Sequence, residues 1–236
     1  WEEREEVIDV LPIERLKNGV AISVTNTHDD ALHAGAEHVS ARKLNAVLSG
    51  LNGVRALEPW VDYPGGKALL DRLEATINAE VKDGDDGLVF TYSGHGDAQV
   101  ICGEPVRGRL TITKCKDILK LFATHPRLSN KFIVVILDNC RDLPSMNAKA
   151  QFDDLGPKTL VAFSTRLGSQ SWIDAHKGCL YTDALADVLE AHGGSLDIES
   201  ILKLLNRRMV TAARLNEAPP ISHNLTCQLF LGNDAV

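Results

Sequence analysis

The stretch FIVVILDNCRD, residues 132–142, joins six apolar residues to a cluster of an acid, an amide, a thiol, a base and a second acid. Continuous apolar runs of this length are typical of strands that are buried on both faces of a parallel sheet. Ligands of such sheets bind at the carboxyl ends of the strands. The stretch therefore predicts a buried strand over 132–137 that brings Asp138, Asn139 and Cys140 to the edge of a sheet.

Apolar runs of the same kind alternate with helical patterns along the rest of the chain. Further strands are predicted at 20–25, 53–57, 88–92, 159–164 and 225–231. Helices are predicted at about 37–51, 69–81, 113–122, 180–192 and 197–215, where apolar residues recur every three or four positions, and a loop at 102–108 precedes the third helix. The alternation of strands and helices predicts an α/β fold, with a mainly parallel sheet and helices on both faces.

Composition excludes several classes of protein. The 236 residues carry a net charge of −7 and no basic cluster, so a nucleic-acid partner is not expected. We expect no membrane association either, because the sequence has no long apolar span and no signal peptide. The five cysteines are odd in number and form no CxxC pair, which predicts a reduced, cytoplasmic protein. The sequence begins with Trp1 rather than Met, so we expect further domains outside it.

No metal and no cofactor are expected from the sequence. No pair of Cys and His residues has the spacing of a zinc finger. The acidic segment DGDDG (83–87) lacks the ligand spacing of an EF-hand and is interpreted as a solvated turn. The segment SVTNTHDD (23–30), which ends the first predicted strand, contains no GxGxxG, so a nucleotide-binding domain is excluded.

A histidine follows the predicted strand at 88–92, in the segment YSGHGD (92–97). If that strand neighbours 132–137, then His95 and Cys140 lie on the same edge of the sheet although they are far apart in the sequence. A thiol needs a nearby base to become the nucleophilic thiolate, and histidine carries protons near neutral pH. A buried cysteine is commonly only a small apolar residue and Gly-His-Gly is commonly a turn, but their combination at successive strand ends favours catalysis.

The glycines beside the histidine suggest how an oxyanion is bound. Gly94 and Gly96 permit positive φ and a close approach of the backbone to a substrate. We expect the N–H groups of Gly96 and Cys140 to stabilise the oxyanion that forms during amide hydrolysis. The other cysteines have no such neighbours in the sequence and are interpreted as structural: Cys102, Cys115, Cys179 and Cys227.

The segments FTYSGHGD (90–97) and VVILDNCRD (134–142) resemble those of the caspase-like cysteine peptidases, which comprise caspases, paracaspases and metacaspases. Further similarity lies in GAE (35–37), AFSTRLGSQSWID (162–174) and ISHNLTCQLFL (221–231), so the resemblance runs from about residue 20 to residue 231. The caspase pattern Q-A-C-[RQG]-G is altered. Asp138 replaces the Gln, Asn139 the Ala and Asp142 the last Gly of this pattern. An Asp two residues before the Cys is more similar to paracaspases and metacaspases.

The resemblance implies a three-layer sandwich with a six-stranded, mainly parallel sheet. It implies His95 as general base and acid and Cys140 as nucleophile, and Ser171 and Trp172 as residues that bind an extended peptide. It also implies a peptidase domain over 20–236 after an extension at 1–19, with a large-subunit-like part (20–150) and a small-subunit-like part (155–236). Caspases dimerise through their last strand and metacaspases generally do not, so a homodimer through the uncharged C-terminal strand at 225–231 is one possibility that the sequence leaves open.

Caspases hold a P1 aspartate with two arginines and a glutamine. The matching positions here carry His33, Ile173 and Asp138. Residues i and i+2 of a strand face the same side, so Asp138 is expected to point as Cys140 does and to attract Arg or Lys at P1. The alternative is that Asp138 caps a loop or orients a neighbour. Self-cleavage in the segment between Cys140 and Thr159, which holds both basic and acidic residues, is left open.

The sequence therefore predicts a cysteine endopeptidase that acts on protein or peptide substrates in cell-death, immune or signalling proteolysis. The alternative is a catalytically silent caspase-like scaffold or regulatory domain, since the motif around Cys140 is altered.

Overall fold

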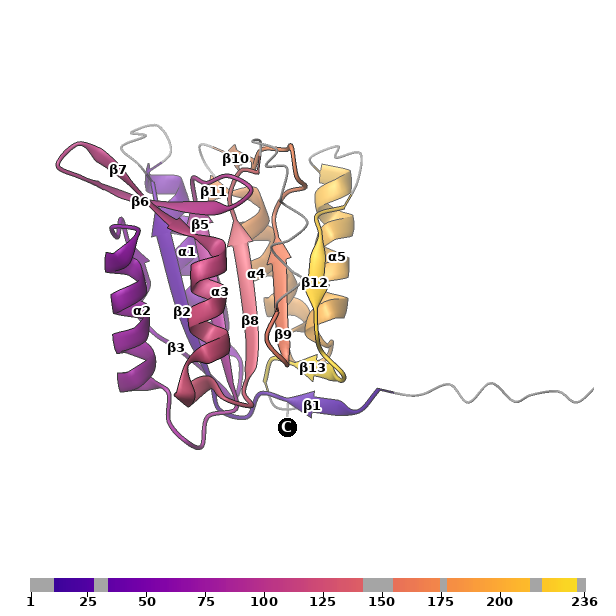
Figure 1. The fold of residues 1–236 in the computed structure, drawn as a ribbon. Coiled ribbons are helices and arrows are strands. Elements are labelled where there is room, and N and C mark those ends of the chain that lie inside the picture. Colours follow the sequence, from indigo (N-terminus) through magenta and orange to yellow (C-terminus); the bar gives the residue numbers. More distant parts are fainter. Residues whose placement is uncertain (1–10, 28–33, 142–154, 175–177, 213–217, 233–236) are drawn as a thin grey trace, which may run out of the picture.

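A seven-stranded sheet forms the centre of the molecule (Figure 1). The computed structural model describes residues 11–27, 34–141, 155–174, 178–212 and 218–232. The strand order is β12-β9-β8-β5-β2-β3, and the short β4 also pairs with β2. All these strands are parallel except β12, which runs antiparallel to β9. The strands are β2 (Gly19–Asn26), β3 (Val54–Ala56), β4 (Trp60–Val61), β5 (Gly87–Gly94), β8 (Phe132–Asp138), β9 (Thr159–Phe163) and β12 (Ile221–His223).

Helices cover both faces of this sheet and make a three-layer sandwich (Figure 1). One face packs on α1 (Ala34–Gly50), α4 (Leu180–His192) and α5 (Ile198–Ala212). The other packs on α2 (Lys67–Glu80), α3 (Cys115–Thr124) and the 3-10 turn η1 (Pro126–Leu128). Strand β8 divides its side chains between the two cores: Val134 and Ile136 face α4, and Val135 and Leu137 face α3. The α/β architecture and the buried strand at 132–137 are thus confirmed. Five of the six expected strands lie in this sheet, and β4 and β12 are additional to them.

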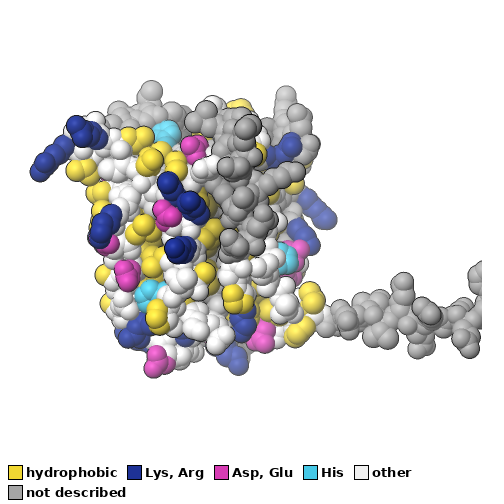
Figure 2. All heavy atoms as spheres, in the orientation of Figure 1, with side chains coloured by type: hydrophobic (Ala, Val, Ile, Leu, Met, Phe, Trp, Pro, Cys, Tyr) yellow, Lys and Arg dark blue, Asp and Glu magenta, His cyan; other side chains and the backbone are white. Residues whose placement is uncertain are grey.

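The segment between the strand that ends at Gly94 and the next helix differs from the prediction. In place of a loop at 102–108, β6 (Val100–Val106) and β7 (Arg109–Lys114) form an antiparallel hairpin, and α3 begins only at Cys115. The predicted helix start at 113 was therefore wrong by two residues. The hairpin projects at the edge of the sheet where the parallel strands end, and its tip carries exposed Arg107 and Arg109 (Figures 1 and 2).

Two glycines let the hairpin dock on the body of the protein. A Cβ added at Gly103 would lie 1.8 Å from the N atom of Gly65, so only glycine fits there. The Thr111 and Thr113 hydroxyls accept hydrogen bonds from the N–H groups of Gly65 and Gly66, both at 2.7 Å. The inner face of the hairpin is therefore fixed beside the carboxyl ends of β2 and β5.

The C-terminal strand is also placed differently from the prediction. Strand β13 (Gln228–Phe230) pairs in parallel with β1 (Ile13–Arg15) and not with the central sheet, whose edge is formed by β12. Residues 225–231 are therefore not the edge strand of the central sheet, as the sequence had suggested, and the homodimer through this strand stays a prediction. Leu16, which follows β1, is fully buried in the core, so part of the predicted extension at 1–19 belongs to the folded unit.

Two smaller features complete the described chain. Strands β10 (Ile173–Asp174) and β11 (Gly178–Cys179) form a two-residue antiparallel pair just before α4. Within the described ranges, none of the helices is long and apolar enough to cross a bilayer.

Candidate active site

The register of two neighbouring strands brings the predicted dyad together. Strands β5 and β8 are parallel neighbours, and Ser93 is paired with Asp138 at the end of their ladder. The ends of β5 and β8 lie at the same rim of the sheet (Figure 1). His95 and Cys140 each follow the last pair of this ladder by two residues, so both lie just beyond that rim. His95 is exposed and Cys140 is partly exposed, whereas the other four cysteines are buried. Among the five cysteines, the partly exposed one is thus the one that follows the same strand rim as His95.

Hydrogen bonds hold the backbone at His95. Its carbonyl accepts the Tyr92 hydroxyl at 2.7 Å and the Cys102 N–H at 2.9 Å. The same Tyr92 hydroxyl reaches the carbonyl of Cys102, which also accepts the fully buried Asn26 amide at 3.0 Å. A buried polar network of this kind fixes a loop more firmly than apolar packing alone, because each partner restricts the next.

Both glycines around the histidine are required by their surroundings. Gly94 has φ 151°, and a Cβ there would lie 2.6 Å from the carbonyl of Asn26. Gly96 forms an isolated bridge with Ile101. The bonds flanking this bridge run from Cys102 N–H to His95 and from Asp97 N–H to Val100, so the hairpin does not use the Gly96 N–H. That N–H can therefore serve the oxyanion role predicted for it.

The predicted substrate residue Asp138 is almost completely buried, at 2% exposed. It lies on the face of β8 that packs on α4, since it follows Val134 and Ile136 at steps of two. One carboxylate oxygen accepts the Ser171 hydroxyl at 2.5 Å, and the other accepts the N–H and hydroxyl of Thr182 at 3.1 and 2.6 Å. Asp138 therefore binds the first turn of α4, as the capping alternative requires, and also contacts Ser171.

The hydrogen-bond donors to Asp138 in the described part of the chain are all neutral. Among the described residues, no Lys, Arg or His lies within ion-pair distance of Asp138. Its stabilisation comes from neutral donors and from the positive end of α4. Burial, and to a smaller extent the charge of Asp138, raise the pKa of the neighbouring Tyr181. A cationic group that entered beside Asp138 would meet a carboxylate that has no counter-ion among the described residues.

The remaining predicted substrate residues lie around Asp138. Ser171 is bound to it, and Trp172, 55% exposed, is the next residue along the chain. The carbonyl of Trp172 accepts the N–H of Leu180 at the start of α4. His33 and Ile173 stand where caspases have the two arginines that hold a P1 aspartate. His33 and the side chain of Ile173 both lie outside the described part of the chain.

Buried groups next to the dyad were not anticipated from the sequence. Arg141, the residue after the predicted nucleophile, is buried. Its guanidinium lies 3.9 Å from the ring centroid of Phe163, and burial lowers the pKa of Arg141.

Two buried thiols near the rim have raised pKa values. Burial raises the pKa of Cys115 to about 12, although Arg141 opposes the shift. Burial, followed by the charges of Asp97 and Cys140, raises the pKa of Cys102. These two thiols therefore remain protonated near neutral pH, in agreement with their predicted structural role.

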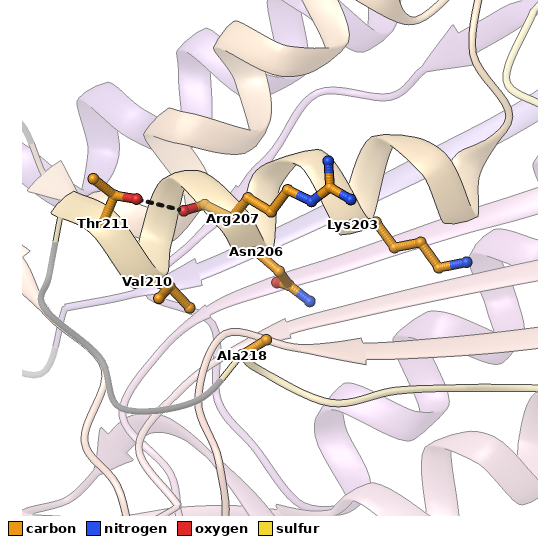
Figure 3. A pocket seen from close by; sticks show the side chains of 6 residues that line it. All are labelled: Lys203, Asn206, Arg207, Val210, Thr211 and Ala218. Carbon is orange, nitrogen blue, oxygen red and sulfur yellow. Dashed lines mark hydrogen bonds between the residues drawn. The ribbon is translucent and has the colours of Figure 1, made fainter.

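A pocket elsewhere contains none of the predicted site residues. It has a volume of about 430 Å³ and lies along α5, lined by Lys203, Asn206, Arg207, Val210, Thr211 and Ala218 (Figure 3). In the part of the chain that the structure describes, no group of three or more His, Cys, Asp or Glu residues is arranged to hold a metal ion.

Comparison with known proteins assigns the family. The model of the caspase domain matches residues 21–230, which is most of the chain. The chain therefore belongs to the caspase-like superfamily of cysteine peptidases. Solved structures similar to it include the crystal structure of caspase-1 from Spodoptera frugiperda, with a TM-score of 0.76, 19% identity, and coverage of 98% of this chain and 97% of that chain. At this identity the likeness shows the fold alone. No curated protein sequence matches the chain at a significant level.

Proposed function

We propose that this chain is a cysteine endopeptidase that uses His95 and Cys140 and cleaves after Arg or Lys. The observation that carries the proposal is the pairing of β5 with β8 up to Ser93 and Asp138, which brings histidine and cysteine to one rim above a buried carboxylate. Protein substrates in the cytoplasm, cleaved in cell-death, immune or signalling proteolysis, are the class that the family supports.

The proposed reaction uses these groups in turn. His95 accepts the proton of the Cys140 thiol, and the thiolate attacks the carbonyl carbon of the scissile peptide bond. The N–H groups of Gly96 and Cys140 stabilise the resulting oxyanion. Protonated His95 then donates its proton to the departing amine, which leaves a thioester on Cys140. Water, deprotonated by His95, attacks the thioester and releases the new carboxylate and the thiol.

The P1 side chain is proposed to reach Asp138. A guanidinium or ammonium beside that carboxylate would supply the counter-charge that the described neighbours do not. A P1 aspartate would instead bring a second negative charge to the same buried site, which is strongly unfavourable. Trp172, half-exposed next to Ser171, is proposed to cover the extended backbone of the peptide.

Peptide selectivity tests this assignment directly. On a panel of fluorogenic peptides that differ only at P1, we expect kcat/KM for Arg to exceed that for Asp by more than about 100-fold, which corresponds to more than about 2.7 kcal/mol of differential transition-state binding. The measurement is initial rate against concentration for Arg, Lys, Leu and Asp at P1. Faster cleavage of the Asp peptide would contradict the S1 assignment, and hydrolysis of none of them would favour the scaffold alternative.

A further inference from the structure

Asn139, between the buried carboxylate and the nucleophile, connects the two strand ends that carry the dyad. Its side chain is completely buried. The amide nitrogen donates to the carbonyl of Cys140 at 2.7 Å and to the carbonyl of Asp97, two residues after His95, at 3.0 Å. One side chain thus joins the loop after β5 to the loop after β8.

The contact between Asn139 and the histidine loop leaves no free space. A Cβ added at Gly96 would lie 2.7 Å from the Asn139 amide nitrogen and 3.1 Å from its Cβ. The amide therefore packs directly on the residue that follows His95. Any shift of Asn139 changes the separation of the backbones that carry His95 and Cys140.

The same side chain carries a cost in stability. Its Oδ1 atom is buried and has no hydrogen-bond partner among the described residues, and a buried acceptor without a partner destabilises the folded state. Turning the amide over would not help, because the oxygen would then face the two carbonyl groups. Asn139 therefore destabilises the fold at a position next to Cys140. Its presence there is better explained by the backbone geometry that it holds than by a gain in stability.

We infer that Asn139 is a positioning residue, which sets the separation and orientation of His95 and Cys140 by holding the Asp97 and Cys140 carbonyls together. The inference rests on the proposed function, because it assigns Asn139 a role in the reaction of that dyad. Asn139 touches neither the scissile bond nor the reacting sulfur in this assignment. Its effect is expected on the rate of the chemical step and not on substrate binding.

The test compares Asn139→Ala with Asn206→Ala. Asn206 is the matched control: it is buried, its amide donates one hydrogen bond to the carbonyl of Pro219 at 2.9 Å, and its Oδ1 also has no partner, but it lies on α5 among the residues of Figure 3. With a peptide carrying Arg at P1, Asn139→Ala should lower kcat about 10–100-fold and change KM less than about threefold. Asn206→Ala should leave both constants near those of the wild type.

A second readout does not need peptidase activity. The rate at which iodoacetamide alkylates Cys140 is measured from pH 5 to 9 by mass spectrometry, with His95→Ala for comparison. If His95 assists the thiol, wild type reacts at lower pH than His95→Ala, and Asn139→Ala should shift toward the profile of His95→Ala. Asn139→Ser, which keeps a single hydroxyl, should fall between wild type and Asn139→Ala and provides a second variant if alanine prevents folding.

The outcomes separate the two claims. Unchanged kcat and an unchanged alkylation profile in Asn139→Ala would overturn the positioning role, as would equal losses in the Asn206→Ala control. If wild type cleaves no peptide, the proposed function fails, while the alkylation profiles still decide whether Asn139 aligns the histidine with the thiol.

Discussion

Replacing Cys140 by Ala is expected to abolish peptide hydrolysis, with a loss in kcat of about 10⁴-fold or more, because no other described thiol is exposed beside a histidine. His95→Ala removes the group that takes the proton from the thiol and returns it to the departing amine. Its kcat should fall about 10²–10⁴-fold. Both values are measured with a peptide that carries Arg at P1.

The control for this pair is Cys115→Ala, which removes a buried thiol at the start of α3. Its activity should stay within about threefold of the wild type, because a thiol whose burial keeps it protonated takes no part in the reaction. Comparable losses in Cys115→Ala and Cys140→Ala, in proteins with the same melting temperature, would remove the basis for choosing Cys140.

After the two variants of the dyad, Asp138→Asn should have the largest effect, and it should act selectively on cationic substrates. The amide keeps the size of the carboxylate but removes the charge that is proposed to attract Arg. We expect kcat/KM for a P1-Arg peptide to fall roughly 100-fold, the amount that loss of about 3 kcal/mol of a desolvated charge interaction would cause. The measurement pairs that peptide with one carrying citrulline, which has nearly the same shape and no charge.

The capping role of Asp138 predicts a different pattern. If the carboxylate serves only Thr182 and the first turn of α4, Asp138→Asn should lower the melting temperature and reduce turnover of the Arg and citrulline peptides by the same factor. The specificity role requires that the preference for Arg over citrulline disappears. The ratio of the two rates therefore distinguishes the interpretations even if the variant is less stable.

Elements with strong local patterns could be predicted from the sequence. The apolar run 132–137 and the helical spacing of Leu69, Leu73 and Ile77 depend only on neighbouring residues, and β8 and α2 lie where these patterns predict. Strand β12 was not predicted, and β13, which lies within the strand predicted at 225–231, was assigned to the wrong sheet. Each has three residues, and its partner lies far away in the sequence. The hairpin of β6 and β7 was missed since its docking depends on a contact between Gly65 and Gly103 that no local pattern shows.

In the candidate site too, features that depend on the sheet pattern could be predicted, and contacts that depend on long-range packing could not. Strand ends in a parallel sheet meet at one rim, so His95 and Cys140 could be paired from the sequence, and the register of β5 and β8 agrees. The face of β8 on which Asp138 lies follows from the alternation of side chains along a strand. Its hydrogen bond to Thr182 could not be predicted, because it depends on how α4 packs against the sheet. The contact of Asn139 with Gly96 and Asp97 arises only when both loops are folded, and the sequence shows merely an amide beside a thiol.

Covalent labelling tests the central claim most directly. A peptide with Arg at P1 and a thiol-reactive acyloxymethyl ketone in place of the scissile bond is incubated with wild type, Cys140→Ala and Asp138→Asn, and the adduct is located by mass spectrometry. We predict a single adduct on Cys140 in the wild type, none in Cys140→Ala, and much slower labelling of Asp138→Asn. Labelling of another cysteine, or faster labelling by the same probe with Asp at P1, would contradict the account.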